Sequence, residues 1–303
     1  MPRKQTRLTG ILAAVPTPFT ADGSAVDEDA LAALVDRLVR AGVHGLVPCG
    51  TTGEFTSLSP EEHRRVIEVY VSAAAGRVPV VAGVGSMTTA GAIDLVQHAE
   101  RVGADAVMLV PPFYDPLDFP TLKVFLAAVA ASTSLPIVYY NVPGATGIRL
   151  DADQVAELGS IDGVDYLKDT SGDAVTLTNL IVSRGDSIRA FNGWDTLTFA
   201  GLALGAEASV WGAASVVPEL AVALWDTVAV HGDLVAGREQ WRDLWAISDW
   251  LESVNYVAGI KAGLELVGHP VGPARAPVQP LPDAGRAAFA AILERAGVPV
   301  VGA

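Results

Sequence analysis

Eight short runs of strand-forming residues recur along this 303-residue chain, and each is followed by residues with the spacing of an amphipathic helix. Their starts lie 20 to 34 positions apart, which suits one strand–helix unit each. Several runs are apolar throughout instead of alternating, which is typical of parallel strands covered on both faces. The runs are Ile11–Phe19, Gly45–Thr51, Val78–Val84, Ala106–Pro112, Pro136–Val142, Val164–Thr170, Ser187–Gly193 and Glu207–Gly212.

Eight such units are the number in a (β/α)8, or TIM, barrel. A doubly wound open sheet is the alternative, but the eight units fit the barrel without remainder. The run from Gly83 to Ser86 has two glycines of a dinucleotide-binding turn, yet Thr88 stands where the third belongs. The sequence therefore predicts an α/β fold of the TIM-barrel type with no nucleotide signal.

Helix boundaries are marked by capping residues. Ser59-Pro60-Glu61-Glu62 is a capping box, and Asp151-Ala152-Asp153-Gln154 opens a helix in a similar way. Asp27 leads into a helix over 29–41. Three glycines are candidate helix ends: Gly42, Gly103 and Gly159.

The chain continues beyond the eighth strand for longer than one helix needs. Four helical segments are predicted there: Pro218–Val230, Leu234–Ser253, Val257–Val267 and Asp283–Ala296. We therefore expect residues 1–230 to form the barrel that carries the active site. Residues 231–303 are expected to form a C-terminal helical region, in which the proline-rich link His269–Pro282 separates the last helix.

Composition excludes several classes of function. The net charge of −14 opposes non-specific binding to nucleic acids or anionic membranes, because both require clustered Lys and Arg. No apolar run reaches the roughly 18–20 residues of a membrane span. Cys49 is the only cysteine and the five histidines are scattered, so we expect no disulfide and no metal site. Cys49 itself is expected to be an apolar filler. A cytoplasmic protein is predicted.

Lys168 is the first candidate for chemistry, because active sites of TIM barrels lie at the carboxyl ends of the strands. It comes near the end of the sixth run and is one of four lysines. Burial lowers the pKa of an amine, and a neutral amine can form an imine with a carbonyl compound. The alternative is a structural ion pair between Lys168 and a carboxylate within the barrel.

Tyr140 ends the neighbouring fifth run, where alternation lets only one of Tyr139 and Tyr140 face inward. A phenol next to an imine-forming lysine can move protons during imine formation and carbon–carbon cleavage. The alternative for Tyr140 is an aromatic residue that only packs.

Two further segments follow strand ends. Gly50-Thr51-Thr52-Gly53-Glu54 offers backbone N–H groups and two hydroxyls that suit a carboxylate, although an ordinary glycine-rich turn has the same composition. The segment from Pro111 to Pro116, which includes Tyr114, is an aromatic loop that can serve as a lid or an interface.

Three motifs together resemble the dihydrodipicolinate synthase / N-acetylneuraminate lyase family in order and spacing. They are Gly50-Thr51-Thr52-Gly53-Glu54, Tyr140-Asn141-Val142-Pro143 and Lys168-Asp169-Thr170-Ser171-Gly172-Asp173. The resemblance covers nearly the whole chain, including the opening Pro16-Thr17-Pro18-Phe19 and the helical C-terminal region.

The resemblance implies a lyase of the class I aldolase type, which binds pyruvate or a related 2-keto acid as a Schiff base and has no metal or organic cofactor. Lys168 resembles the imine-forming lysine and Tyr140 the proton-relaying tyrosine. Thr51 and Thr52, with Gly50, match the turn that holds the keto-acid carboxylate, and Thr52 is also placed among the catalytic residues. The remaining matches are Tyr114, which resembles a tyrosine that reaches into a neighbouring subunit, and the pocket positions Gly193 and Val210. The family is commonly homotetrameric, as a dimer of dimers.

One position departs from the pattern. Dihydrodipicolinate synthases typically read Asn-Val-Pro-x-Arg-Thr-Gly after the tyrosine, whereas Ala145 stands here at the arginine. That arginine grips the carboxylate of the aldehyde substrate, and a methyl group makes no bidentate contact. Arg149 would compensate only along a different loop path. Neuraminate lyases usually read Gly-Ser-Thr-Gly-Glu, with a serine at the position of Thr51.

The sequence therefore looks more like the branch of the family that cleaves or condenses 2-keto-3-deoxy sugar acids or 4-hydroxy-2-keto acids. Dehydration of a 2-keto-3-deoxy acid through the same imine is an alternative, followed by dihydrodipicolinate synthesis. A non-catalytic barrel that only binds a ligand is the alternative from another class. A sugar-phosphate enzyme has only the loop Gly212-Ala213-Ala214-Ser215 in its favour, with no basic residue beside it.

Overall fold

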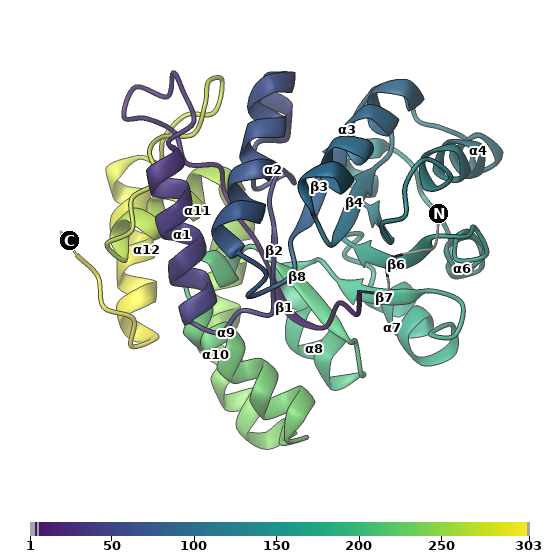
Figure 1. Cartoon of the computed structure of the whole chain (residues 1–303). Coiled ribbons are helices and arrows are strands. Elements are labelled where there is room, and N and C mark those ends of the chain that lie inside the picture. The colour runs from purple at the N-terminus through teal and green to yellow at the C-terminus, as the bar shows by residue number, and fades with distance from the viewer. Residues whose placement is uncertain (1–3, 5, 302–303) are drawn as a thin grey trace.

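The eight predicted strands form one parallel sheet that closes on itself, as the computed structural model of residues 4 and 6–301 shows (Figure 1). The strand order is β2-β1-β8-β7-β6-β5-β4-β3, and a parallel bridge between Leu46 and Val80 joins the two ends of this order. The strands are β1 (Gly10–Ala14), β2 (Gly45–Val47), β3 (Val81–Gly85), β4 (Ala106–Val110), β5 (Ile137–Asn141), β6 (Val164–Asp169), β7 (Arg189–Asn192) and β8 (Ala208–Trp211). The predicted TIM barrel is confirmed.

Some strands are shorter than their apolar runs. β1 ends at Ala14 instead of Phe19, because Pro16 and Pro18 have no N–H group to donate to a sheet. β2 ends at Val47, and Cys49 beyond it adopts a left-handed φ of 55° that no strand continues. The apolar residues beyond both strands therefore cover the barrel mouth as loops.

Helices alternate with the strands and surround the sheet. They are α1 (Glu28–Arg40), α2 (Pro60–Ala74), α3 (Thr89–Val102), α4 (Phe119–Ala130), α5 (Pro143–Thr146), α6 (Ala152–Leu158), α7 (Ala174–Ser183), α8 (Thr198–Ala203) and α9 (Pro218–Trp225). Short helical turns are η1 (Phe55–Ser57), η2 (Asp195–Leu197), η3 (Ala213–Ser215) and η4 (Asp226–Val230).

The predicted capping boxes at Ser59 and Asp151 are confirmed, with both reciprocal hydrogen bonds present in each. Gly103 ends α3 in the left-handed conformation. Gly159 ends α6 for a different reason, because its φ is ordinary but a Cβ atom there would lie 2.0 Å from the carbonyl oxygen of Ser187.

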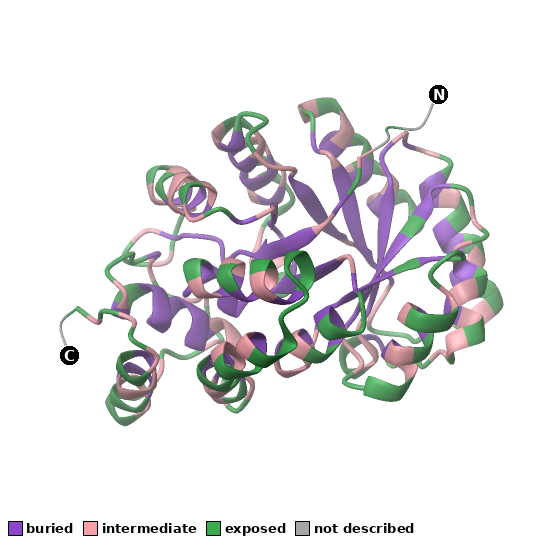
Figure 2. Cartoon of the chain, turned by 90° about the horizontal axis from the view of Figure 1, so that it is seen from below, coloured by how far each residue is buried: buried purple, intermediate pink, exposed green. Residues whose placement is uncertain are grey.

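The apolar core has two layers, which follow from the alternation of side chains along each strand. Tyr140, Val138 and Met108 belong to the layer within the barrel. Tyr139 and Leu109 belong to the larger layer between the sheet and the helices. Figure 2 shows the strands buried along most of their length, with exposure concentrated on the outer faces of the helices.

Three further helices follow the barrel: α10 (Leu234–Glu252), α11 (Tyr256–Leu266) and α12 (Asp283–Arg295). They lie on the side of the barrel where α1 and α9 run, away from α4 and α6 (Figure 1). The predicted helix over 218–230 is interrupted, because α9 gives way at Asp226 to the single π-turn η4. Of the helices that the structure describes, none is both long and apolar enough to cross a membrane.

Candidate active site

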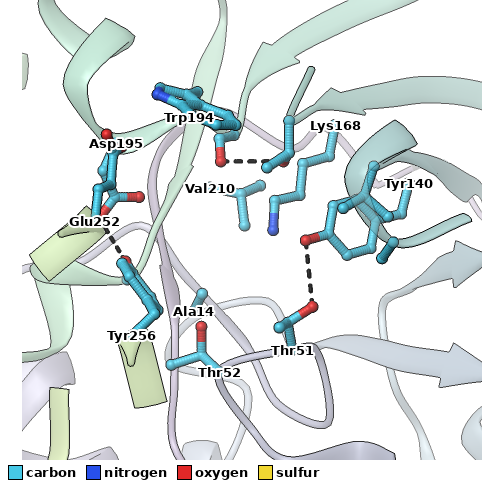
Figure 3. A pocket seen from close by; sticks show the side chains of 15 residues that line it. Ala14, Thr51, Thr52, Tyr140, Lys168, Trp194, Asp195, Val210, Glu252 and Tyr256 are labelled. Atoms are coloured by element: carbon cyan, nitrogen blue, oxygen red, sulfur yellow. Dashed lines mark hydrogen bonds between the residues drawn. The ribbon is translucent and has the colours of Figure 1, made fainter. Parts of the chain in front are cut away.

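A cavity of about 220 Å³ opens at the carboxyl ends of the strands (Figure 3). Its lining residues come from the strand ends, the segments that follow them and the junction of α10 with α11. They are Ala14, Thr51, Thr52, Tyr140, Val142, Ala145, Lys168, Thr170, Gly193, Trp194, Asp195, Val210, Gly212, Glu252 and Tyr256.

Lys168 extends from β6 into this cavity (Figure 3). Its side chain is buried, with a residue exposure of 6%, and its Nζ lies 4.1 Å from the centre of the Tyr140 ring. The two residues are direct partners in the pairing of β5 with β6. Among the residues described, no carboxylate forms an ion pair with Lys168, so the structural ion pair considered above is not found. The amine is therefore available to a ligand.

Tyr140 completes a short chain of polar groups. Its hydroxyl lies 3.4 Å from Thr51 Oγ1 (Figure 3). Burial by itself raises the pKa of the phenol, but the positive charge of Lys168 and the hydrogen bond with Thr51 outweigh burial. The pKa of Tyr140 therefore lies below its usual value of 10.0. A phenol with a lowered pKa is a better partner for proton transfer near neutral pH.

The turn after β2 presents its two threonines to the cavity. Thr52 is buried and Thr51 is exposed at the cavity mouth. The tightness of the turn requires Gly53, because a Cβ atom there would lie 2.7 Å from the backbone nitrogen of Cys49. Gly50 is buried within the turn and does not line the cavity.

The two predicted pocket positions, Gly193 directly after β7 and Val210 on β8, both line the cavity. Gly193 has a specific steric role, because a Cβ atom there would lie 2.7 Å from both Cγ and Cε of Lys168. The side chain of Lys168 thus occupies the space that a larger residue at position 193 would take.

Tyr114 lies apart from the cavity of its own chain. It is 84% exposed and lies beside Phe113 and Asp115, in a surface depression between β4 and α4. The structure describes a single chain, so Tyr114 does not meet Lys168 here.

Three ionisable residues of the lining were not predicted as site residues: Asp195, Glu252 and Tyr256. Asp195 lies two residues beyond the end of the seventh predicted run. Glu252 and Tyr256 end α10 and begin α11, and nothing in their local sequence indicates a site. Gly212 leaves room for the tyrosine, because a Cβ atom there would lie 2.1 Å from Tyr256 Oη.

The short helix α5 places the methyl group of Ala145, and no guanidinium, at this part of the cavity. Ala145 lines the cavity, whereas Arg149 is exposed and lies outside the lining. Cys49 is buried, burial raises the pKa of its thiol, and its Sγ faces the carbonyl oxygen of His63. Across the described ranges, no group of three or more His, Cys, Asp or Glu side chains is placed to hold a metal ion.

Comparison with known proteins identifies a family. The model of the dihydrodipicolinate synthetase family matches residues 7–296. The 4-hydroxy-tetrahydrodipicolinate synthase of Methanopyrus kandleri is 37% identical over 274 residues, which cover 90% of this chain and 91% of the relative. The dihydrodipicolinate synthase DapA-2 of Bacillus anthracis superimposes with a TM-score of 0.90 at 32% identity, covering 96% of this chain and 99% of that one. YagE of Escherichia coli, solved in complex with pyruvate, superimposes with a TM-score of 0.92 at 30% identity, covering 97% and 100%.

Proposed function

The chain belongs to the dihydrodipicolinate synthetase family of carbon–carbon lyases, and from this premise we propose that it is a class I aldolase in which Lys168 forms an imine with pyruvate or a related 2-keto acid. The observation that carries the proposal is the buried Lys168 amine, which has no carboxylate partner among the described residues. It lies against Tyr140, whose hydroxyl approaches Thr51.

The neutral amine of Lys168 attacks the keto carbon, and loss of one water gives the imine. The protonated imine draws electrons from the adjacent carbon, so a proton leaves that carbon and an enamine forms. The enamine carbon attacks the carbonyl carbon of an aldehyde, whose oxygen takes up a proton. Water then hydrolyses the imine and regenerates the amine, and cleavage runs through the same steps in reverse.

Tyr140 is proposed to carry the protons in these steps. It lies next to the amine, and its pKa is lowered despite its burial. Thr51 and Thr52 are proposed to hold the carboxylate of the keto acid through hydroxyl and backbone N–H groups. Gly50 supports this turn, and Gly193 and Val210 bound the space around the imine. No external cofactor enters this mechanism.

The exposed position of Tyr114 supports a role between subunits. We propose a homotetramer built as a dimer of dimers, in which Tyr114 of one chain extends the relay from Tyr140 and Thr51 in another chain. The lone buried Cys49 supports a reducing compartment, and we propose that the enzyme works in the cytoplasm. Residues 231–303 are proposed to be a helical extension that completes the site, because Glu252 and Tyr256 reach the cavity.

The second substrate is proposed to be a neutral aldehyde, released from or added to a 2-keto-3-deoxy sugar acid or a 4-hydroxy-2-keto acid. Ala145 in the lining supports this choice over dihydrodipicolinate synthesis. Dehydration of a 2-keto-3-deoxy acid uses the same imine and remains the alternative reaction. The sugar-phosphate reading is disfavoured, because Ser215 Oγ already donates to the carbonyl oxygen of Ala14 and Gly212 contacts Tyr256.

Exchange of the methyl protons of pyruvate for deuterium in D₂O tests the proposal without any aldehyde. We expect the enzyme to accelerate this exchange, as observed by proton NMR, because enamine formation labilises those protons. Lys168→Ala should abolish the acceleration and Tyr140→Phe should slow exchange by roughly 10²-fold or more. Lys123→Ala, at an exposed lysine paired with Glu157, is the matched control and should leave the rate unchanged. Exchange at the uncatalysed rate with the wild-type protein would favour the non-catalytic barrel.

A further inference from the structure

The wall of the cavity opposite Lys168 is acidic. Asp195, Glu252 and Tyr256 form it, and we call these three residues the acidic wall (Figure 3). They come from η2, the end of α10 and the start of α11, so parts of the chain far apart in sequence converge there.

Asp195 is the buried member of the acidic wall. Its Oδ2 accepts hydrogen bonds from the Tyr256 hydroxyl and from the backbone N–H of Ala213. These two bonds fix the carboxyl group and direct the phenol. Tyr256 Oη lies in the space next to Gly212, where a side chain at position 212 would displace it.

Glu252 is held in place by one neighbour. Its Oε1 accepts from the backbone N–H of Thr196 at 3.0 Å, and its Oε2 accepts from Thr196 Oγ1 at 2.9 Å. Each carboxylate oxygen has more than one acceptor site, so the group can still accept hydrogen bonds from a ligand. Glu252 is half-buried and lines the cavity.

Among the described residues that line the cavity, none apart from Lys168 sets a positive charge against this wall. Lys168 is the single basic residue in the cavity lining, and its nitrogen carries no positive charge once the protonated imine has become the enamine that meets the aldehyde. An anionic group that entered beyond the imine would meet two carboxyl groups without a guanidinium or ammonium partner. A hydroxyl group, in contrast, can donate to the Glu252 carboxylate or to the phenol oxygen of Tyr256, whose own O–H is donated to Asp195.

We propose that the acidic wall determines the specificity for the second reactant: it admits an uncharged aldehyde that carries hydroxyl groups and rejects one that carries a carboxylate or a phosphate. The inference rests on the proposed function, because an aldehyde reacts here only after the enamine has formed. Trp194 and Val142 provide the apolar sides of the same space.

The test measures kcat/KM for the addition of pyruvate to three aldehydes. Glyceraldehyde is uncharged and hydroxylated, succinate semialdehyde is anionic, and propanal is uncharged without a hydroxyl group. Glu252→Gln replaces a carboxylate, and Asp195→Asn replaces a carboxyl group, by an amide of the same shape, and Tyr256→Phe removes only the hydroxyl. Glu157→Gln, at an exposed surface pair, controls for the loss of one negative charge.

We expect the wild-type enzyme to prefer glyceraldehyde at least about tenfold over each of the other two aldehydes, since buried polar groups discriminate strongly when left unpaired. Glu252→Gln and Asp195→Asn should each reduce the preference for glyceraldehyde over succinate semialdehyde severalfold. Tyr256→Phe should reduce the preference over propanal, and Glu157→Gln should change neither ratio. Because Asp195 is buried and its variant can fail to fold, the Glu252 variant at the cavity edge decides the result.

Reduction of each variant with borohydride in the presence of pyruvate separates this inference from the proposed function. A wild-type protein that forms no adduct contradicts the proposed function itself. An adduct together with a preference for succinate semialdehyde, or with ratios unchanged in Glu252→Gln, overturns the acidic wall alone. An adduct without addition to any of the three aldehydes also overturns it.

Discussion

At the scale of single residues, the position of the Lys168 amine is set by two neighbours, the glycine at position 193 and the ring of Tyr140. Gly193 has no side chain, and the Lys168 stem lies in the resulting space. Tyr140 places a ring against the ammonium group, with Nζ at 4.1 Å from the ring centre. Imine formation requires the amine within reach of the keto carbon, so errors of about 1 Å in its position slow the reaction strongly.

Gly193→Ala tests this steric argument. The new Cβ atom would lie 2.5 Å from Thr170 Oγ1 and 2.7 Å from two carbons of Lys168, so the lysine must move. We expect the rate of pyruvate deuteration to fall by at least about tenfold while the protein stays folded. Gly285→Ala in α12, where a Cβ atom makes only 3.9 Å contacts, is the control and should keep the rate. An unchanged rate in Gly193→Ala would refute the steric role.

The pKa of Asp195 determines the direction in which this residue changes the free energy of unfolding as pH rises. Burial, together with Glu252, raises this pKa from its ordinary 3.8 to about 7, despite the opposing hydrogen bond from Tyr256. The folded protein then holds a proton that the unfolded chain releases between about pH 4 and pH 7. This contribution therefore lowers the free energy of unfolding as pH rises through that window, by up to about 4 kcal/mol.

We expect the wild-type protein to lose more stability than Asp195→Asn between pH 5 and pH 8, because asparagine does not titrate. Chemical denaturation at the two pH values measures the difference, and the variant serves as the reference for all other titrating groups. Equal pH dependence in the two proteins would show that Asp195 is ionised throughout.

The proximity of Lys168 and Tyr140 could be predicted from the sequence for a physical reason. Lys168 and Tyr140 end adjacent strands, and side-chain alternation together with strand pairing brings such residues together. Glu252 ends α10 and Tyr256 begins α11. The amphipathic pattern of these helices indicates which face is buried but not against which part of the barrel it packs. Their contribution to the cavity depends on how α10 and α11 pack, which local periodicity does not specify.

At the scale of secondary-structure elements, a buried ion pair links the turn that carries Thr51 and Thr52 to the C-terminal region. Lys261 of α11 and Glu54 lie 2.7 Å apart, with side-chain exposures of only 4% and 3%. The backbone N–H of Arg275 donates to Glu54 Oε2, and Lys261 Nζ donates to the carbonyl oxygen of Pro273. The glutamate of the first sequence motif is thus structural, linking the barrel to residues beyond it.

Lys261→Met should destabilise the protein by about 3–5 kcal/mol, because it leaves the buried Glu54 carboxylate without its ion-pair partner. Adding Glu54→Gln should restore part of the loss, since the double variant buries no lone charge. Lys123→Met breaks an ion pair of similar length at the surface and should cost less than about 1 kcal/mol. Denaturant titration measures all three, and similar losses for Lys261→Met and Lys123→Met would argue against this anchoring.

At the scale of the whole molecule, the alternation of strands and helices determines the barrel. Assembly into oligomers depends on exposed surfaces that this alternation does not specify. Tyr114 is exposed on one such surface, away from its own cavity. A residue of this kind acts in catalysis only if another subunit brings a site to it. The proposed tetramer is therefore part of the proposed mechanism.

Mixing two inactive variants tests this arrangement. Chains with Tyr114→Phe keep Lys168, and chains with Lys168→Ala keep Tyr114. If Tyr114 serves a neighbouring chain, mixed oligomers contain complete sites, and pyruvate deuteration should recover after subunit exchange, with native mass spectrometry reporting the mixed species. Mixed oligomers that stay as slow as the two parents combined would mean that Tyr114 does not act across the interface.

The central claim is that Lys168 forms a covalent imine with a 2-keto acid. The most direct measurement is the intact mass of the protein after incubation with pyruvate and borohydride, with Lys168→Ala alongside and peptide mapping of the product. The account predicts one reduced pyruvate adduct per chain, located on Lys168 and missing from the variant. No adduct with pyruvate or with a panel of longer 2-keto acids, or an adduct on another lysine, would contradict it.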